Sequence, residues 1–276
     1  MRRAKRTLAI LALTTTLVGC SSATMPANTP AISPEALQIY TTSSTRPLIN
    51  SFAPAYSELF PNITLESRSA NYDNLRSALN SGEMPYFVTN HLPQESALWS
   101  APIGQDALTI IAHPDFPLTG LSLDELRAIY QGRFQDLEMG ANMIRGVVLL
   151  SREDGSGTRA EFERLVMGER TILQASRVAS SSQSMIDGVA NTPNAIGFVS
   201  MGYLNATGQN TRVKVLAVDA VIPSQATIID STYPLRNTIF VIGNVEPQGA
   251  NRQFVTWAQS PAGQMIVSRH YAPFIP

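Results

Sequence analysis

Cysteine and lysine are almost absent from this chain of 276 residues. The one cysteine is Cys20, so no internal disulfide can form, and the two lysines are Lys5 and Lys214. Charged residues make up 15% of the chain, below the usual quarter. Any recognition of an anion must therefore rely on arginine, backbone N–H groups and hydroxyl groups.

Histidine and long apolar runs are scarce as well. His91, His113 and His270 do not have the spacing of metal ligands, so we expect no metal site and no cofactor. We expect His113, which precedes Pro114, to lie in a loop and His270 to lie on the surface. Beyond the N-terminal segment, no stretch is long and apolar enough to span a bilayer.

The N-terminal segment has the pattern of a secretory signal. It places four cations in "MRRAKR" ahead of the short apolar run "TLAILALTTTLVG". The following "LVGC", residues 17–20, resembles the bacterial lipobox, in which the cysteine becomes the lipid-bearing N-terminus. We expect a signal peptide at 1–19, lipidation of Cys20 and a flexible, Pro-spaced tether at 20–35. An ordinary signal peptide with a chance cysteine is the alternative.

Removal of residues 1–19 changes the charge of the chain. It takes away four of the 20 Lys and Arg residues and leaves 16 against 21 Asp and Glu, a net charge of −5. A net-acidic body argues against general binding to nucleic acid. We therefore expect an extracytoplasmic protein, anchored by lipid to a bacterial membrane, with no nucleic-acid partner.

The periodicity of the folded part alternates between strand and helix. The first five segments are predicted to be a strand, a helix, a strand, a helix and a strand, at 37–41, 43–60, 62–68, 71–82 and 86–90. This alternation is typical of a parallel α/β layer. Ser43 or Ser44 is the expected N-cap of the first helix, which Pro54 should kink or shorten.

The same alternation continues to the end of the chain. Strands are predicted at 105–115, 146–154 and 236–243, and helices at 122–132 and 158–168. Residues 182–200 read as a helix, a turn and a strand, and 251–274 as two helices separated at Pro261. Ser122 and Glu125 have the spacing of a capping box.

The segment "SREDGSGTRAEFE", residues 151–163, joins a strand to a helix through a glycine-rich turn. Gly155 and Gly157 allow the backbone to come close to a ligand, and the helix start presents unpaired N–H groups. Ser156 and Thr158 add hydroxyl donors, and Arg152 adds a planar fork suited to an oxyanion. Because all these groups donate, the segment predicts a site for a small anion.

A second hydroxyl-rich strand end lies at "TTSST", residues 41–45. It has the same order of strand, hydroxyl groups and helix start. Two such ends, far apart in sequence, are expected to face each other across a cleft.

The chain from residue 37 to 274 resembles the phosphate-binding proteins of ABC importers. The run 152–158 resembles their R-x-D-G-S-G-T motif, and "NAIGFVSMGYL" (194–204) is similar to their G-A-I-G-Y segment. "VIPSQATIIDSTYPLRNTIFV" (221–241) is similar to a third segment of that family. The resemblance implies an α/β, two-lobed type II periplasmic binding protein fold, with two crossover strands that act as a hinge.

The resemblance also implies boundaries, ligand contacts and partners. Lobe 1 should comprise 36–104 and 236–276, and lobe 2 should comprise 105–235, with crossovers near 101–108 and 233–238. The residues implied for phosphate binding are Thr42, Ser43, Ser44, Ser69, Arg152, Ser156, Gly157 and Thr158. The implied partners are an ABC permease and ATPase, and the chain is expected to be a monomer.

The loop after the third strand departs from the family pattern. Family members often carry there an acidic residue that accepts a proton from hydrogen phosphate, whereas this chain has "VTNHLP". His91, beside Asn90, is the predicted stand-in for that acceptor. Phosphate-over-sulfate discrimination is then expected to shrink as the pH falls through the titration range of the histidine.

Other interpretations remain open from sequence alone. The ligand could be sulfate or another oxyanion, or the chain could be a ligand-sensing or protein-interaction module of the same fold. The Gly-Ser-Gly turn could be only a helix cap, and Ser156 could be the nucleophile of a secreted hydrolase. The hydrolase interpretation is weakened by the absence of a G-x-S-x-G motif.

Overall fold

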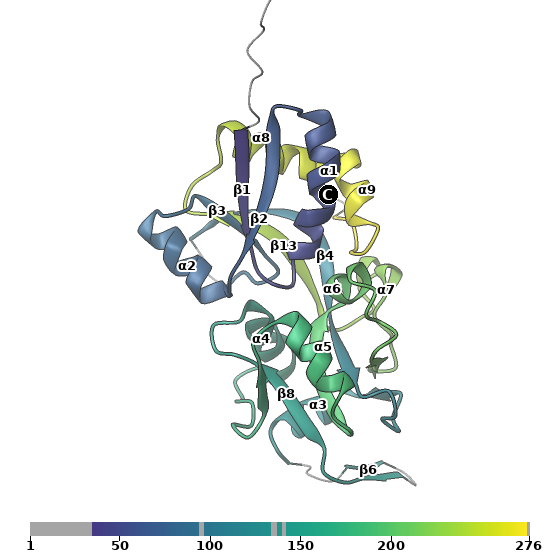
Figure 1. Cartoon of the computed structure of the whole chain (residues 1–276). Coiled ribbons are helices and arrows are strands. Elements are labelled where there is room, and N and C mark those ends of the chain that lie inside the picture. Colours follow the sequence, from purple (N-terminus) through teal and green to yellow (C-terminus); the bar gives the residue numbers. More distant parts are fainter. Residues whose placement is uncertain (1–34, 94–96, 134–136, 140–141, 275–276) are drawn as a thin grey trace, which may run out of the picture. The chain divides into compact units, whose positions relative to one another are not determined.

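The computed structural model describes residues 35–93, 97–133, 137–139 and 142–274 (Figure 1). The predicted signal peptide, Cys20 and all of the tether except Glu35 lie outside these ranges. Among the described residues, no helix combines the length and the apolar character that a membrane span requires.

The first five elements follow the predicted order. They are β1 (Glu35–Thr41), α1 (Arg46–Leu59), β2 (Ile63–Ser69), α2 (Tyr72–Ser81) and β3 (Tyr86–Thr89). Strand β1 pairs in parallel with both β2 and β3. The carboxyl ends of these strands therefore lie along one edge of the sheet, where Thr41 and Ser69 are paired in register.

A long strand, β4 (Trp99–Ala112), belongs to two sets of strands. Its first part pairs antiparallel with β13 (Arg236–Gly243), and its second part pairs antiparallel with β10 (Ala195–Ser200). The sheet order is β2-β1-β3-β13-β4-β10-β8-β9. Strands β4 and β13, which overlap the predicted crossovers, connect the parts drawn above and below in Figure 1.

The strand β8 and the helix after it match the predicted strand at 146–154 and helix at 158–168. Strand β8 (Val148–Arg152) pairs in parallel with β10 and with β9 (Arg177–Ala179). The helix consists of α4 (Gly157–Phe162) and a π-helical continuation, η1 (Glu163–Met167). A π-helical turn is rare and occurs frequently at functional sites.

The remaining elements are short or close the chain. They are β5 (Gly120–Leu121), α3 (Leu123–Tyr130), β6 (Leu137–Met139), β7 (Asn142–Ile144), α5 (Ser182–Ala190), α6 (Met201–Ala206), β11 (Lys214–Val215), β12 (Ala217–Val218), α7 (Gln225–Ile229), α8 (Gly249–Gln259) and α9 (Pro261–Val267). The predicted break at Pro261 is confirmed, because Ser260 ends α8 and caps α9.

The helix caps confirm one prediction and correct another. Ser122 and Glu125 form the predicted capping box of α3. The N-cap of α1 is Thr45, not Ser43 or Ser44, and no side chain caps this helix. The Thr45 hydroxyl contacts Thr41 Oγ1 at 2.6 Å and donates to the Val88 carbonyl, so it joins a hydroxyl network at the strand ends instead. Pro54 lies inside α1 without ending it.

Two main hydrophobic cores lie around the two parts of β4, one of which pairs with β13 and the other with β10. One contains Phe52, Tyr56, Phe254 and Trp257, whose rings meet edge to face at 5.0–6.1 Å. The other includes Phe162 and Phe198, whose rings stack at 4.2 Å. Burial of each such ring contributes about 1.5–3 kcal/mol, so these clusters hold the strand ends in place.

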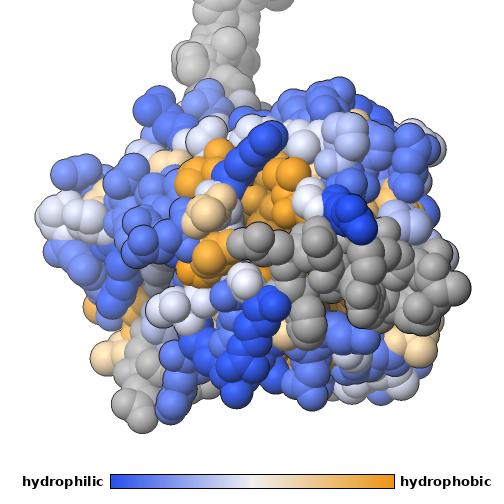
Figure 2. Space-filling view, turned by 90° about the horizontal axis from the view of Figure 1, so that it is seen from below, coloured by the Kyte–Doolittle hydropathy of each residue, from blue (hydrophilic) through white to orange (hydrophobic). Residues whose placement is uncertain are grey.

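One face of the molecule carries a group of hydrophobic side chains. Figure 2 views the end that carries α3 and β8 in Figure 1, and there hydrophobic side chains gather near the centre with hydrophilic ones around them. The cavity described next is lined mainly by polar and charged side chains.

Candidate anion-binding site

A cavity of about 260 Å³ lies where the two predicted strand ends meet. It is lined by seven of the residues predicted to bind the ligand: Thr42, Ser43, Ser69, Arg152, Ser156, Gly157 and Thr158. The predicted juxtaposition of the segments 41–45 and 151–163 is therefore present in the structure.

The glycines at the start of α4 allow a close approach between segments distant in sequence. Gly155 has a φ of +77°, and a Cβ there would lie 2.8 Å from Asp73 Oδ2. A Cβ on Gly157 would lie 3.3 Å from the Cβ atoms of His91 and Tyr72. Only glycine can occupy position 155 without backbone strain and without overlap with Asp73. Because Gly155 has no Cβ, the turn that opens α4 can pack directly against α2.

Arg152 is buried and held in one orientation. Its Nε donates to the Ala179 carbonyl and to Glu153 Oε2, both at 2.9 Å, and its Nη2 donates to Glu153 Oε1 at 3.0 Å. These bonds fix the guanidinium plane at the end of β8. The Nη1 group has no hydrogen bond to any described residue and is free to donate to a ligand.

The segment that follows β1, residues 42–45, contributes a network of hydroxyl groups. Thr42 Oγ1 lies 3.0 Å from both Ser44 Oγ and Thr45 Oγ1, and Ser43 Oγ lies 3.2 Å from Ser182 Oγ at the start of α5. Because a hydroxyl group can rotate, Thr42 and Ser43 can redirect their protons toward an anion. Ser44 donates to Asn90 Oδ1 and does not line the cavity.

Two charged residues of the cavity wall were missed by the sequence analysis. Arg46, the first residue of α1, lines the cavity beside Tyr203, where its charge partly offsets the rise in the tyrosine pKa that burial causes. Glu153 also lines the cavity, with its side chain 22% exposed. Arg46 directly follows the hydroxyl run, and this position is the sequence signal that could have found it.

The structure does not bring Asn90 and His91 into the wall of this cavity. The backbone N–H of His91 donates to Thr89 Oγ1, and its Nδ1 lies 2.8 Å from Oε1 of the buried Glu161. With its ring between Tyr72 and Glu161, His91 links the loop after β3 to α4. The carboxylate that lines the cavity is that of Glu153, whose two oxygens accept from Arg152.

The balance of charge in the wall favours a small anion. Arg46 and Arg152 provide two positive charges against the one negative charge of Glu153, and most of the other side chains carry hydroxyl or amide groups that can donate. Tyr72, another wall residue, has a buried hydroxyl without a hydrogen-bond partner among the described residues. Donors held in a concave, partly desolvated site are the arrangement that suits a tetrahedral oxyanion.

Two other kinds of site find no support in this arrangement. The Ser156 hydroxyl accepts the backbone N–H of Arg159, and no histidine of the described residues forms a hydrogen bond with it. Nucleophilic catalysis by a serine requires such a base. Within the described ranges, no group of three His, Cys, Asp or Glu residues could hold a metal ion.

Comparisons with known proteins identify the family and the fold of this chain. A profile of the family described as "PBP superfamily domain" matches residues 28–262. Phosphate-binding protein PstS of Pseudomonas aeruginosa is 24% identical over 251 residues, which cover 80% of this chain and 77% of that protein. Phosphate-binding protein PstS 2 of Streptococcus pneumoniae is 28% identical over 130 residues, or 44% of this chain, and the match spans only 43% of that relative's length.

A solved structure has the same fold. It is described as a phosphate ABC transporter substrate-binding protein from Clostridium perfringens with bound phosphate. Its TM-score is 0.78 at 22% identity, and the match covers 87% of this chain and all of that one. The α/β fold of a type II periplasmic binding protein, which the sequence predicted, is thereby confirmed.

Proposed function

Because this chain belongs to the family of PBP superfamily domains, we propose that it is an extracytoplasmic binding protein that captures phosphate in the 260 Å³ cavity. The observation that carries the proposal is the convergence on this cavity of Arg152, the start of α4 and the hydroxyl groups that follow β1. The relatives named phosphate-binding proteins, and the phosphate complex from Clostridium perfringens, support phosphate as the ligand.

Binding is proposed to close two lobes around the anion. Lobe 1 comprises 36–104 and 236–276, and lobe 2 comprises 105–235. Strands β4 and β13 pass between them and serve as the hinge. The bond between Ser43 and Ser182, and that between the Asp73 N–H and the Gly155 carbonyl at 3.1 Å, join these lobes beside the cavity. The phosphate would add further bonds across the same gap.

Phosphate is preferred over sulfate in this proposal because Glu153 faces the ligand. At neutral pH hydrogen phosphate carries a proton that it can donate to a carboxylate, whereas sulfate carries none. A carboxylate facing an unprotonated oxyanion repels it and leaves a lone pair unpaired. Sulfate or another oxyanion would be the ligand if Glu153 turned away from the bound anion.

The cellular role rests on the N-terminal sequence and on the relatives. The "LVGC" segment supports a lipid anchor at Cys20, and the description of the Clostridium perfringens structure supports a role in phosphate transport by an ABC transporter. A permease and ATPase as partners, and a monomeric state, follow from the family resemblance of the sequence. The same fold could instead serve sensing or adhesion. In that case phosphate would still bind in the cavity, but loss of the chain would leave phosphate uptake unchanged.

Calorimetric titration of the ligand-stripped protein with phosphate, sulfate and chloride tests the proposal. We expect saturable binding of one phosphate per chain and weaker binding of sulfate. Chloride, a monovalent anion, serves as the control for ionic strength. The absence of saturable heat with millimolar phosphate would overturn the proposed function, and tighter binding of sulfate would replace phosphate by sulfate as the ligand.

A further inference from the structure

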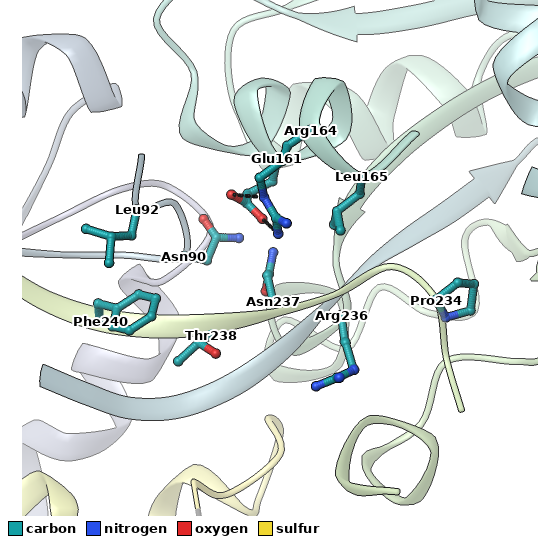
Figure 3. Close-up of a pocket in the computed structure, with 10 residues that line it drawn as sticks. All are labelled: Asn90, Leu92, Glu161, Arg164, Leu165, Pro234, Arg236, Asn237, Thr238 and Phe240. Atoms are coloured by element: carbon teal, nitrogen blue, oxygen red, sulfur yellow. Dashed lines mark hydrogen bonds and ion pairs between the residues drawn. The ribbon is translucent and has the colours of Figure 1, made fainter. Parts of the chain in front are cut away.

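A second cavity, of about 420 Å³, lies beside β13 and shares no lining residue with the first. Figure 3 shows its walls, which come from the loop after β3, from the helix α4–η1 and from β13. The α4–η1 helix contacts both cavities: its first residues line the anion site, while Glu161, Arg164 and Leu165 line the second cavity.

Unsatisfied polar atoms mark the wall of this second cavity. Asn237 is 7% exposed, and neither polar atom of its amide has a hydrogen-bond partner in the described structure. Asn90 is 2% exposed, and its Nδ2 is also without a described partner, although its Oδ1 accepts from Ser44. Buried amides are nearly always paired, so these groups point to a missing partner.

The donors converge on one position. In Figure 3 the amides of Asn90 and Asn237 point toward each other and toward the guanidinium of Arg164. Arg164 is held by Glu161 through Nη2 at 2.6 Å and Nε at 3.2 Å. Both oxygens of Glu161 are engaged, because Oε1 also contacts His91. A partner at this position must therefore bring its own oxygen acceptors.

Apart from Thr238, the rest of the wall is apolar, with a positive rim. Leu92 and Phe240 lie on one side in Figure 3, and Leu165 and Pro234 lie on the other. Arg236 is exposed at the edge. An inorganic oxyanion would place charged oxygens against these apolar side chains. A molecule with one anionic end and a short hydrocarbon body satisfies both parts of the wall.

We propose that this second cavity is a binding site for short aliphatic carboxylates. The carboxylate would accept hydrogen bonds from Asn90 Nδ2, Asn237 Nδ2 and Arg164, and the hydrocarbon would lie against Leu92, Leu165 and Phe240. A hydroxyl group next to the carboxylate would donate to Asn237 Oδ1. A 2-hydroxy acid therefore binds more tightly than the unsubstituted acid of the same length.

The test is a titration of the whole folded domain with 3-methylbutanoate and with its 2-hydroxy derivative, followed by NMR of the side-chain amide groups. The uncharged 3-methylbutanamide is the matched control ligand. We expect saturable shifts of the Asn90 and Asn237 amide signals with both acids, tighter binding of the hydroxy acid and no saturation with the amide. Unmoved amide signals at millimolar acid would overturn the proposal and leave water as the partner of these groups.

Point variants distinguish carboxylate binding in the second cavity from binding in the first, anion-binding cavity. Asn237→Leu keeps the branched shape and the number of heavy atoms of the side chain and removes an unpaired amide, so the fold should remain intact while carboxylate affinity falls roughly ten-fold or more. Arg236→Glu, at an exposed position, should weaken binding without a risk to folding. Arg152→Ala should leave carboxylate binding unchanged. A carboxylate affinity that follows Arg152 and not Asn237 would place the ligand in the first cavity and contradict the proposal.

Discussion

Among single residues, Arg152 should contribute most to binding of the anion. A charge-assisted hydrogen bond is worth roughly 1.5–3 kcal/mol, so Arg152→Ala should weaken phosphate binding about ten- to a hundred-fold. The variant also leaves the Glu153 carboxylate without its partner, so this carboxylate repels the anion more strongly. Calorimetry gives the comparison, with Arg252→Ala, in an exposed ion pair, as the control. Equal affinity of wild type and Arg152→Ala would mean that the guanidinium does not contact the ligand.

Glu153 should determine selectivity rather than affinity. Glu153→Gln removes the charge that repels an unprotonated oxyanion, so we expect the phosphate-over-sulfate ratio to fall about ten-fold. Competition binding measures this ratio. His91→Asn should leave it unchanged, because the imidazole lies outside the cavity wall. A ratio that responds to His91 and not to Glu153 would restore the histidine as the proton acceptor.

Asp106 gives stability a dependence on pH. It is fully buried in β4, where it accepts from Ser200 Oγ and from the N–H of Gly202 and Ala107. Burial raises its pKa from 3.8 to about 6, despite these bonds. A raised pKa favours the protonated form in the fold, so the contribution of this group to stability is complete below about pH 4 and is lost as the pH rises through about 6.

Asp106→Asn should remove this dependence. A shift of about two pKa units corresponds to about 3 kcal/mol. Urea unfolding between pH 4 and pH 7 should therefore show the wild type losing stability relative to Asp106→Asn as the pH rises. Curves that run parallel over that window would show that the carboxyl group keeps an ordinary pKa.

At the scale of elements, the turn that opens α4 depends on Gly155. A Cβ there would combine left-handed backbone strain, about 1–2 kcal/mol, with an overlap against Asp73. Gly82, which ends α2 with a φ of +79° and open space around its Cβ position, offers a control with the same strain and no overlap. Gly155→Ala should lower both stability and phosphate affinity, whereas Gly82→Ala should lower stability alone. Equal phosphate affinity in the two variants would contradict this role of the turn.

The order of elements was predictable, but the orientation of several side chains was not. Alternation of strands and helices predicted β1 to β3, and the Gly-Ser-Gly turn predicted the start of α4, because both depend on local sequence. The direction of the His91 ring depends on Glu161, seventy residues further on. Glu153 entered the cavity wall because Arg152 holds its carboxylate. The contact of His91 with Glu161 has no local signature, and the π-helical turn η1 has none either. The pair of Arg152 and Glu153 is local, but its place in the cavity wall depends on the tertiary fold.

At the scale of the whole molecule, the proposed capture of phosphate requires β4 and β13 to let the two proposed lobes move. Phosphate should then reduce the distance between labels on the exposed residues Leu59 and Val178, which lie in different lobes. Arg152→Ala at the same phosphate concentration provides the control, because its cavity should stay mostly empty. A distance that phosphate leaves unchanged in the wild type would mean that the lobes are already fixed before binding.

The most direct test of the central claim is a crystal structure of the ligand-stripped protein after addition of phosphate. We predict one phosphate in the 260 Å³ cavity, with hydrogen bonds from Arg152, Ser156 and Thr42 and with one oxygen facing Glu153. Phosphate bound elsewhere, or a cavity that stays without phosphate in crystals containing millimolar phosphate, would contradict it.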